Sequence, residues 1–219
     1  MYSYENLKVL QNLYRLKALD IEYTDPLEFN STIENNIDVS DFQTLVNKIK
    51  DCHLCDLCKS RTQSLSGFGN EKASVLFVDH VVSEMEDSSN SYFCGRSGEM
   101  LQNMILNVLE LSLNDIYFTH TIKCKPLDFK KGFEAEWKSC SGYLYSQIEF
   151  IKPKVIVTLG EEAFHKITGD KEPLEKVRGH IMEFKGIKLI PIYHPNFILR
   201  NPNLKKVVFS DLKTIKSCL

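Results

Sequence analysis

Five of the chain's seven cysteines are spaced as metal ligands often are. Cys52, Cys55 and Cys58 fall within seven residues of one another, in DCHLCDLCKSR. Two others, Cys124 in TIKCKP and Cys140 in EWKSCSGYL, follow much later. A C-x2-C pair turns tightly enough to aim two thiolates at one point, and two cysteines from elsewhere complete a set of four. Zinc and a [4Fe–4S] cluster both accept four thiolates, and the 15 residues between the last two cysteines favour the larger cluster. Buried, unreactive thiols are the alternative.

Composition narrows the setting of this chemistry. The chain has 219 residues, of which 43% are hydrophobic and 26% charged, and its net charge is −2. Such a chain suits one domain, or a domain with a small appendage, and any binding of nucleic acid would need a local basic patch. We find neither a signal-peptide pattern nor an apolar run of membrane length, so we expect a cytoplasmic protein with no membrane association. We also expect it to be a monomer. Thiols stay reduced in the cytoplasm, which favours metal binding over disulfides.

Four short apolar runs predict the strands that would hold the site. Helical patterns at 97–111 and 134–151 separate the first three runs, and a further helix is expected at 203–216. This alternation predicts an α/β fold with three α/β/α layers around a central, mostly parallel four-stranded sheet. The runs are SVLFVD (74–79), DIYFTHTI (115–122), KVIVTLG (154–160) and KLIPIYH (188–194).

The stretch before the cysteines has a different pattern. Residues 5–18 predict an amphipathic helix, and residues 23–38 are polar and predict a linker. We therefore divide the chain into an N-terminal helical extension and linker, 1–45, and a main domain, 46–219.

Polar residues gather where the predicted strands end. Asp79 and His80 end the first strand, His120 lies in the second, Gly160 follows the third and His194 ends the fourth. In open α/β sheets, ligands bind beyond the carboxyl ends of the strands. Three of the six histidines fall at these ends, so a ligand site is expected there.

Several stretches together are similar to family 4 of the uracil-DNA glycosylases, the iron–sulfur branch of that superfamily. The resemblance covers about residues 45–215 and implies an enzyme that hydrolyses the N-glycosidic bond of uracil, or of another altered base, in DNA during base excision repair. It also implies a [4Fe–4S] cluster held by Cys52, Cys55, Cys124 and Cys140, with Cys58 left out. The matching stretches are CHLCDLCKSR, EDSSNSYFCGRSGEML (86–101), IYFTHTIKCKP, CSGYLYSQIEFIKPKVIVTLGEEA (140–163), RGH (178–180) and YHPNFILR (193–200).

The resemblance implies roles for single residues. Phe93 stacks on the extruded base, and His194 donates a hydrogen bond to its O2, at a strand end that the following proline terminates. Gly160 lets the backbone pass close to the pocket. Asp79 is assigned to substrate binding and His80 to catalysis, because they stand in the family's first motif, which shapes the pocket and positions the water. We expect His80 and His120 to face one pocket with Phe93 and His194.

Two basic patches are candidates for contact with DNA phosphates. From them we assign Lys125, Arg178 and Arg200 to DNA binding. The apolar residues 196–199 would wedge into the base stack or pack internally. The patches comprise Lys123, Lys125, Lys130 and Lys131 after the second strand, and Arg178, His180, Arg200, Lys205 and Lys206 near the fourth.

The sequence departs from the family pattern at two places. The first motif, Gly-Glu-Ala-Pro-Gly in the family, reads Asp-His-Val-Val-Ser at 79–83. His120 replaces the asparagine that reads uracil's amide edge, and a neutral imidazole has its donor and acceptor on opposite sides of the ring. These departures leave two other interpretations open. One is a non-catalytic or re-purposed relative that binds DNA or a protein partner, and the other is an RNA- or nucleotide-binding module.

Overall fold

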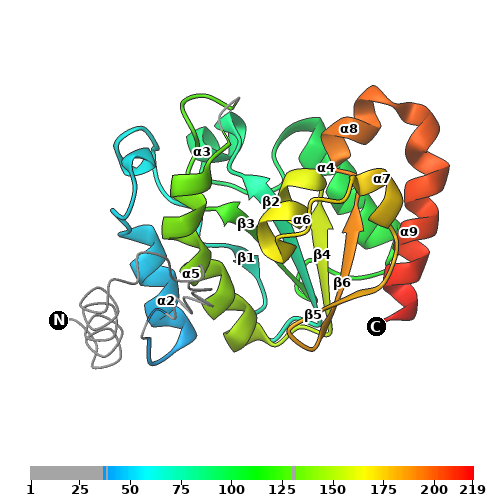
Figure 1. Ribbon diagram of the computed structural model, residues 1–219, viewed down its shortest axis with the longest axis horizontal. Coiled ribbons are helices and arrows are strands. Elements are labelled where there is room, and N and C mark those ends of the chain that lie inside the picture. The colour runs from blue at the N-terminus through cyan, green and yellow to red at the C-terminus, as the bar shows by residue number, and fades with distance from the viewer. Residues whose placement is uncertain (1–36, 38, 130–131) are drawn as a thin grey trace, which may run out of the picture. The chain divides into compact units, whose positions relative to one another are not determined.

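Figure 1 shows the computed structural model of the chain. The predicted helix at 5–18 lies outside the residues that the structure describes, and so does all of the predicted linker except residue 37. The division of the chain at residue 45 stays a prediction. None of the described helices is both long and apolar enough to cross a membrane. The structure describes residues 37, 39–129 and 132–219.

A twisted sheet forms the middle layer, and within the described residues it has six strands in the order β1-β3-β2-β4-β6-β5. The four central strands are parallel and correspond to the four predicted ones, which confirms the mostly parallel α/β sheet. The two edge strands pair antiparallel and were not predicted. They have only two and three residues and no buried apolar run, so the sequence carries little signal for them. The strands are β1 (Phe68–Gly69), β2 (Val75–Val81), β3 (Ile116–Ile122), β4 (Val155–Leu159), β5 (Met182–Phe184) and β6 (Ile187–Ile192).

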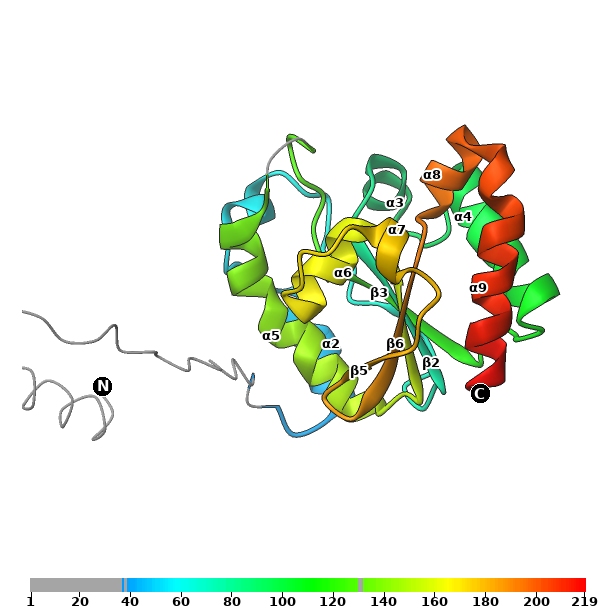
Figure 2. The same cartoon turned by 45° about the vertical axis from the view of Figure 1, so that its right-hand side comes forward.

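Helices cover both faces of the sheet, as Figures 1 and 2 show, so the three layers are confirmed. On one face α4, η2 and α9 contribute Leu101, Ile105 and Leu212 to a core that includes Phe77 of β2. On the other face α5 and α6 pack against the sheet, and α2 packs against α5. The helices that cover the two faces are α2 (Phe42–Lys50), α4 (Gly95–Asn103), the π-helical η2 (Met104–Val108), α5 (Glu134–Ile151), α6 (Glu161–Thr168) and α9 (Lys205–Ser217).

Short helices lie beyond the carboxyl ends of the parallel strands, at the top of Figure 1. They are α3 (Glu84–Ser89), α7 (Leu174–Val177) and α8 (Pro195–Arg200), and two 3-10 turns complete the described elements, η1 (Asp56–Lys59) and η3 (Pro202–Leu204).

The two-residue period of the strands decides which side chains share a face. Val75 and Phe77 of β2 belong to the core under α4 and α9, whereas Leu76 and Val78 belong to the core under α5 and α6. Asp79 continues the first series and His80 the second. Neighbouring residues of β2 are thus directed to opposite faces, and their roles must differ.

Candidate functional site

A cavity of about 510 Å³ opens at the carboxyl ends of the parallel strands. Its wall combines the last residues of β2, residues at the ends of β4 and β6, one residue of β3, and residues of α3 and of the start of α4. The predicted site residues that line it are Asp79, His80, Phe93, Gly160 and His194. His120 is not among the lining residues.

His194 is held in one tautomer by its place at the start of α8. Its Nδ1 accepts a hydrogen bond from the backbone N–H of Asn196, at 3.1 Å, and Pro195 occupies the first position of the helix. Because Nδ1 accepts, the neutral ring carries its proton on Nε2. Nε2 lies 3.1 Å from Oδ2 of Asp79, to which it donates.

The contact between Asp79 and His194 shifts the pKa of both groups. Burial raises the pKa of the Asp79 carboxyl, but the charge and the hydrogen bond of His194 outweigh burial and leave this pKa below its ordinary value. Burial lowers the pKa of His194, but the Asp79 carboxylate outweighs it and the pKa is raised. The other carboxylate oxygen of Asp79 accepts the backbone N–H of His80, at 2.7 Å. Asp79 is therefore an ionised acceptor in the cavity wall.

Gly160 makes this contact possible. It follows β4, which lies between β2 and β6 in the sheet, and its φ of +86° is in the region that favours glycine. A Cβ at this position would lie 3.1 Å from the Cβ of His194. The missing side chain leaves room for Asp79 and His194 to meet across the end of β4.

His120 lies behind the cavity wall. It is fully buried, and its ring packs edge-on against Phe118, with centroids 5.1 Å apart, and parallel to Tyr92 at 6.2 Å. Its Nε2 is 3.4 Å from Oε1 of Glu86, yet neither ring nitrogen has a hydrogen bond of good geometry. The expectation that His120 faces the cavity is thus not met, because Glu86 lines the cavity instead.

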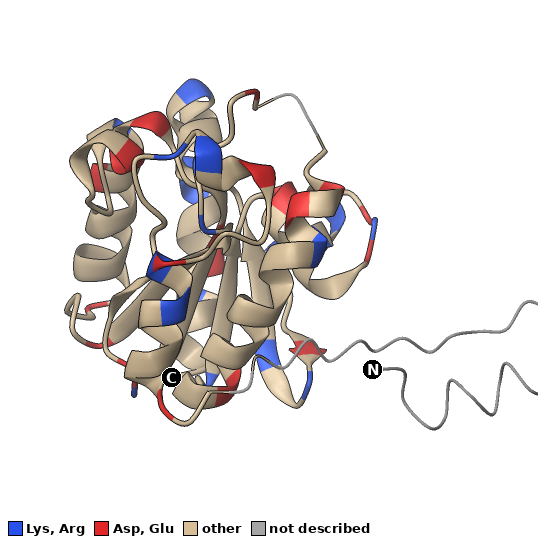
Figure 3. Cartoon of the chain, turned by 90° about the vertical axis from the view of Figure 1, so that its left-hand side faces the viewer, with Lys and Arg blue, Asp and Glu red and all other residues tan. Residues whose placement is uncertain are grey.

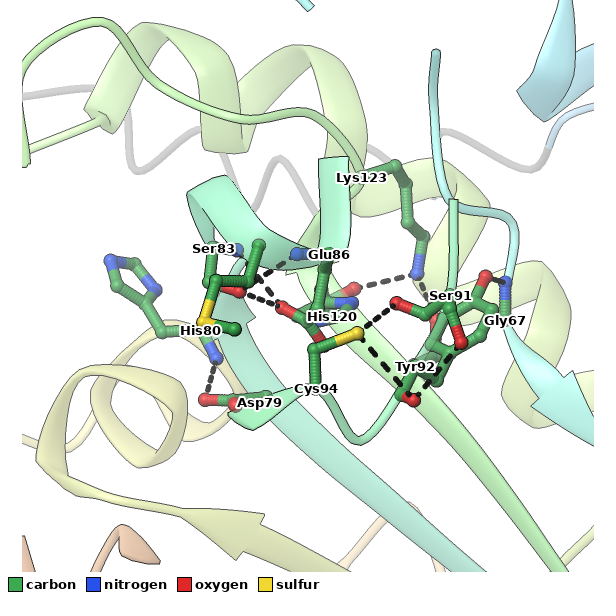
Figure 4. A network of polar contacts seen from close by, with 12 residues as sticks. Gly67, Asp79, His80, Ser83, Glu86, Ser91, Tyr92, Cys94, His120 and Lys123 are labelled. Atoms are coloured by element: carbon green, nitrogen blue, oxygen red, sulfur yellow. Dashed lines mark hydrogen bonds and ion pairs between the residues drawn. The ribbon is translucent and has the colours of Figure 1, made fainter. Parts of the chain in front are cut away.

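Glu86 is the residue that the sequence interpretation missed. It forms a capping box at the start of α3, where Oε2 accepts the backbone N–H and the hydroxyl of Ser83 at 2.9 and 2.7 Å (Figure 4). The Ser-x-x-Glu spacing of this motif was visible in the sequence. The next residue, Asp87, is buried and accepts the backbone N–H and the hydroxyl of Thr62. Through Thr62, α3 is tied to the cysteine-rich segment.

Phe93 is fixed at the entrance to α4. Its φ is +59°, and its ring lies 5.0 Å from the ring of Phe118. Gly98 packs so closely beneath it that a Cβ there would lie 1.9 Å from the carbonyl carbon of Phe93. The ring is 8% exposed and lines the cavity. A rigid apolar surface therefore faces the space beside Asp79 and His194.

The ring of His80 is directed away from Asp79, as Figure 4 shows, and His80 is among the residues that line the cavity. Its Nδ1 lies 3.1 Å from Oγ1 of Thr121, and its ring is 5.8 Å from that of Phe133. The Thr121 hydroxyl donates to the backbone oxygen of His80, so Nδ1 must be the donor and Nε2 the acceptor nitrogen. Burial lowers the pKa of His80, which keeps the ring neutral.

Four cysteines line a second, smaller cavity: Cys52, Cys55, Cys124 and Cys140. Cys58 is not part of its lining. Arg61 donates to Sγ of Cys124 at 2.8 Å and to the backbone oxygen of Cys52. Burial raises the pKa of the Cys124 and Cys140 thiols to about 11 and about 12. Among the described residues, no three Cys, His, Asp or Glu side chains are arranged to hold a single metal ion.

This set of donors is of the kind that holds thiolate-bound metal groups. The four sulfur atoms come from three segments that share one cavity, and a guanidinium donates to one of them. A group with several metal atoms keeps its thiolates farther apart than a single tetrahedral ion does. Because thiols with raised pKa values are protonated, they must release protons when they bind such a group.

The basic residues differ in how far they are available to DNA. Lys123 is 1% exposed, and its Nζ donates to Thr119, Gln147 and the backbone oxygen of His120. Burial lowers the pKa of Lys123 to about 7. Its predicted phosphate contact is therefore wrong. Lys130 and Lys131 lie outside the described residues, and Lys125 lies 3.9 Å from Glu84 at the cavity rim.

Arg178 is engaged within the protein. Its Nε and Nη2 donate to the two carboxylate oxygens of Asp211, at 3.0 and 2.5 Å, and its guanidinium lies 5.6 Å from the ring of Tyr193. Arg200, by contrast, is exposed at the end of α8. In the view of Figure 3, acidic and basic residues are interspersed. Any contact with DNA therefore depends on a few local cations.

Comparison with known proteins gives consistent matches. The family model for the uracil DNA glycosylase superfamily matches residues 66–213. The type-4 uracil-DNA glycosylase of Saccharolobus solfataricus is 34% identical over 80% of this chain and 85% of its own length. The proteins of the same name from Archaeoglobus fulgidus and Thermotoga maritima are 35% and 34% identical, each over 78% of this chain and over 89% and 90% of their own lengths.

The contact between Asp79 and His194 predicts a specific change in titration. Replacing Asp79→Asn removes the charge that raises the pKa of His194 and leaves the burial that lowers it. The pKa of His194 should then fall, as followed by NMR of the ring nitrogens. The control Glu149→Gln removes an exposed charge from α5, outside the cavity lining, and should leave this pKa in place. An unchanged pKa in Asp79→Asn would contradict the contact.

Proposed function

Because the chain belongs to the type-4 branch of the uracil DNA glycosylase superfamily, we propose that it removes uracil from DNA in base excision repair. The reaction is hydrolysis of the bond between the base and the deoxyribose. The observation that carries the proposal is a hydrogen-bond donor of fixed tautomer, Nε2–H of His194, in a cavity that Phe93 also lines.

Base binding comes first. The enzyme unstacks the target nucleotide and turns its base into the cavity, which costs a few kcal/mol, roughly, and least in single strands or mismatches. Phe93 offers the stacking surface; its backbone packs closely on Gly98, and its ring packs against Phe118. Gly160 keeps the floor of the cavity open.

Bond cleavage then places negative charge on the departing base. His194 donates from Nε2 to O2, where this charge develops, and the bond from Asn196 to Nδ1 keeps the proton on the correct nitrogen. Preorganised donors of this kind contribute about 10²–10³ in rate. His80 is the proposed base for the attacking water. Its acceptor nitrogen, Nε2, and its lowered pKa support that role.

DNA contacts surround the cavity mouth. Arg200 and Lys125 are proposed to contact phosphates. Arg178 is proposed to act on the same side, with its guanidinium held by Asp211. Phe197 and Leu199 of α8 are 43% and 36% exposed, whereas Ile198 between them is fully buried. The two exposed side chains are the proposed wedge beside the extruded base.

A [4Fe–4S] cluster is the proposed group in the cysteine cavity, with Cys52, Cys55, Cys124 and Cys140 as its ligands. When bound, it would supply a cross-link between three distant segments rather than a step of the hydrolysis. Arg61 would stabilise the thiolate of Cys124. We further propose that the protein acts in the cytoplasm, since reduced thiols are needed to load the cluster, and that it acts as a monomer.

The cluster proposal predicts iron in the purified protein. Protein prepared without oxygen should be brown and carry about four iron atoms per chain. Cys124→Ser should lose the colour and unfold at lower denaturant concentration, because binding of the cluster is coupled to folding. Cys58→Ser is the matched control and should keep its iron, because Cys58 does not line the cavity. A colourless, folded protein that contains zinc would contradict the proposal.

The role of His194 predicts a loss in chemistry rather than in binding. His194→Ala should slow uracil release in single-turnover assays by about 10²–10³ while DNA affinity, measured by fluorescence anisotropy, changes little. His165→Ala, a change on α6 outside the cavity lining, is the matched control and should behave as wild type. Equal losses of rate and affinity would remove His194 from catalysis and favour a relative that only binds DNA.

A further inference from the structure

The cavity lacks the expected reader of the base's amide edge. The position that would read this edge is occupied by His120, which is fully buried behind Glu86 and does not line the cavity. Of the two carboxylate oxygens of Glu86, Oε2 is bonded to Ser83 in the capping box and Oε1 lies 3.4 Å from Nε2 of His120. A base that enters the cavity must therefore be distinguished by other polar groups of its wall.

Asp79 and His194 together have the required pattern. One offers an acceptor and the other a donor, 3.1 Å apart, and both line the cavity. Uracil presents an acceptor, O2, directly beside a donor, N3–H, on its Watson–Crick edge. A donor and an acceptor side by side are complementary to such an edge.

The order of the strands gives the direction in which the edge would lie. From β3 through β2 and β4 to β6, the strands carry or lead to His120, Asp79, Gly160 and His194 in turn. A base with O2 at His194 and its amide edge running along the strand ends toward β3 meets Asp79 next. Gly160, between them, has no side chain to obstruct it. N3–H then faces the Asp79 carboxylate.

We propose that Asp79 reads N3–H of uracil, so that base selectivity rests on residue 79 rather than on residue 120. The inference rests on the proposed role of His194 as donor to O2. When the base enters, Nε2–H of His194 donates to O2 of the base instead of to Asp79. The Asp79 carboxylate then accepts a hydrogen bond from N3–H of the base. One hydrogen bond is lost and two are formed.

This arrangement discriminates between uracil and cytosine. Cytosine also presents O2 to His194, but its N3 carries a lone pair instead of a hydrogen. That lone pair would face an ionised carboxylate, which leaves two acceptors in contact without a proton between them. A site rejects a wrong ligand strongly when binding of that ligand would leave a buried polar group without a hydrogen-bond partner. Thymine shares the amide edge of uracil, so Asp79 does not exclude it.

The test compares release of uracil and of cytosine from otherwise identical single-stranded oligonucleotides under single-turnover conditions. Wild type should release uracil and leave cytosine. Asp79→Asn should lower the ratio of the two rates at least about tenfold, because an amide can turn its NH2 toward cytosine N3. Glu149→Gln is the matched control, an acid-to-amide change at an exposed position of α5 outside the cavity lining, and should keep the wild-type ratio. His120→Asn should also keep it.

Several outcomes would overturn the inference while the proposed function stands. An unchanged ratio in Asp79→Asn would do so, and so would a changed ratio in His120→Asn alone. Faster uracil release by Asp79→Gly with an unchanged ratio would show that Asp79 only obstructs the cavity.

A wild type that releases no base would instead contradict the proposed function. Binding then tests the inference separately, by anisotropy with uracil- and cytosine-containing oligonucleotides. Wild type should prefer the uracil oligonucleotide and Asp79→Asn should not. Equal affinity of the wild type for both would overturn the role of Asp79.

Discussion

The hydrogen bond between Asp79 and His194 joins the ends of two strands that are not neighbours in the sheet. The contact has room because a glycine follows β4, which lies between them, and both residues continue the same face of the sheet. Asn196 fixes the proton of His194 from the other side. The cavity therefore contains one donor and one acceptor whose positions are set by the strand ends rather than by mobile loops, and the proposed chemistry follows from this pair.

The cysteine cavity and the cavity at the strand ends are physically connected. Asp87 of α3 binds Thr62, which follows the cysteine-rich segment, while its neighbour Glu86 lines the cavity at the strand ends. Lys123, which directly precedes Cys124, donates to the backbone oxygen of His120. A cluster bound by the four cysteines would stabilise the segments from which these contacts come. Its proposed role is thus to hold the wall of the site in place.

The sequence was sufficient for the features that short patterns specify. Continuous apolar runs gave the four parallel strands, helical periodicity gave the layers, and the strand-end rule located the cavity with Asp79, Gly160 and His194 in its wall. The remaining features depend on tertiary structure. Lys123 looks like a surface cation in the sequence, and only the packing of β3 against Gln147 of α5 shows that it is buried. His120 was expected to face the cavity, and only the return of α3 over the strand ends covers it with Glu86. The opposite directions of Asp79 and His80 could have been read from the two-residue period of a strand.

We infer that one donor and one acceptor at the strand ends read the base. A crystal structure of the protein with a uracil-containing oligonucleotide would show this contact. We expect O2 within hydrogen-bond distance of Nε2 of His194, and N3 within hydrogen-bond distance of the Asp79 carboxylate. A bound uracil whose N3 faces Glu86 or His120, while Asp79 remains bonded to His194, would contradict it.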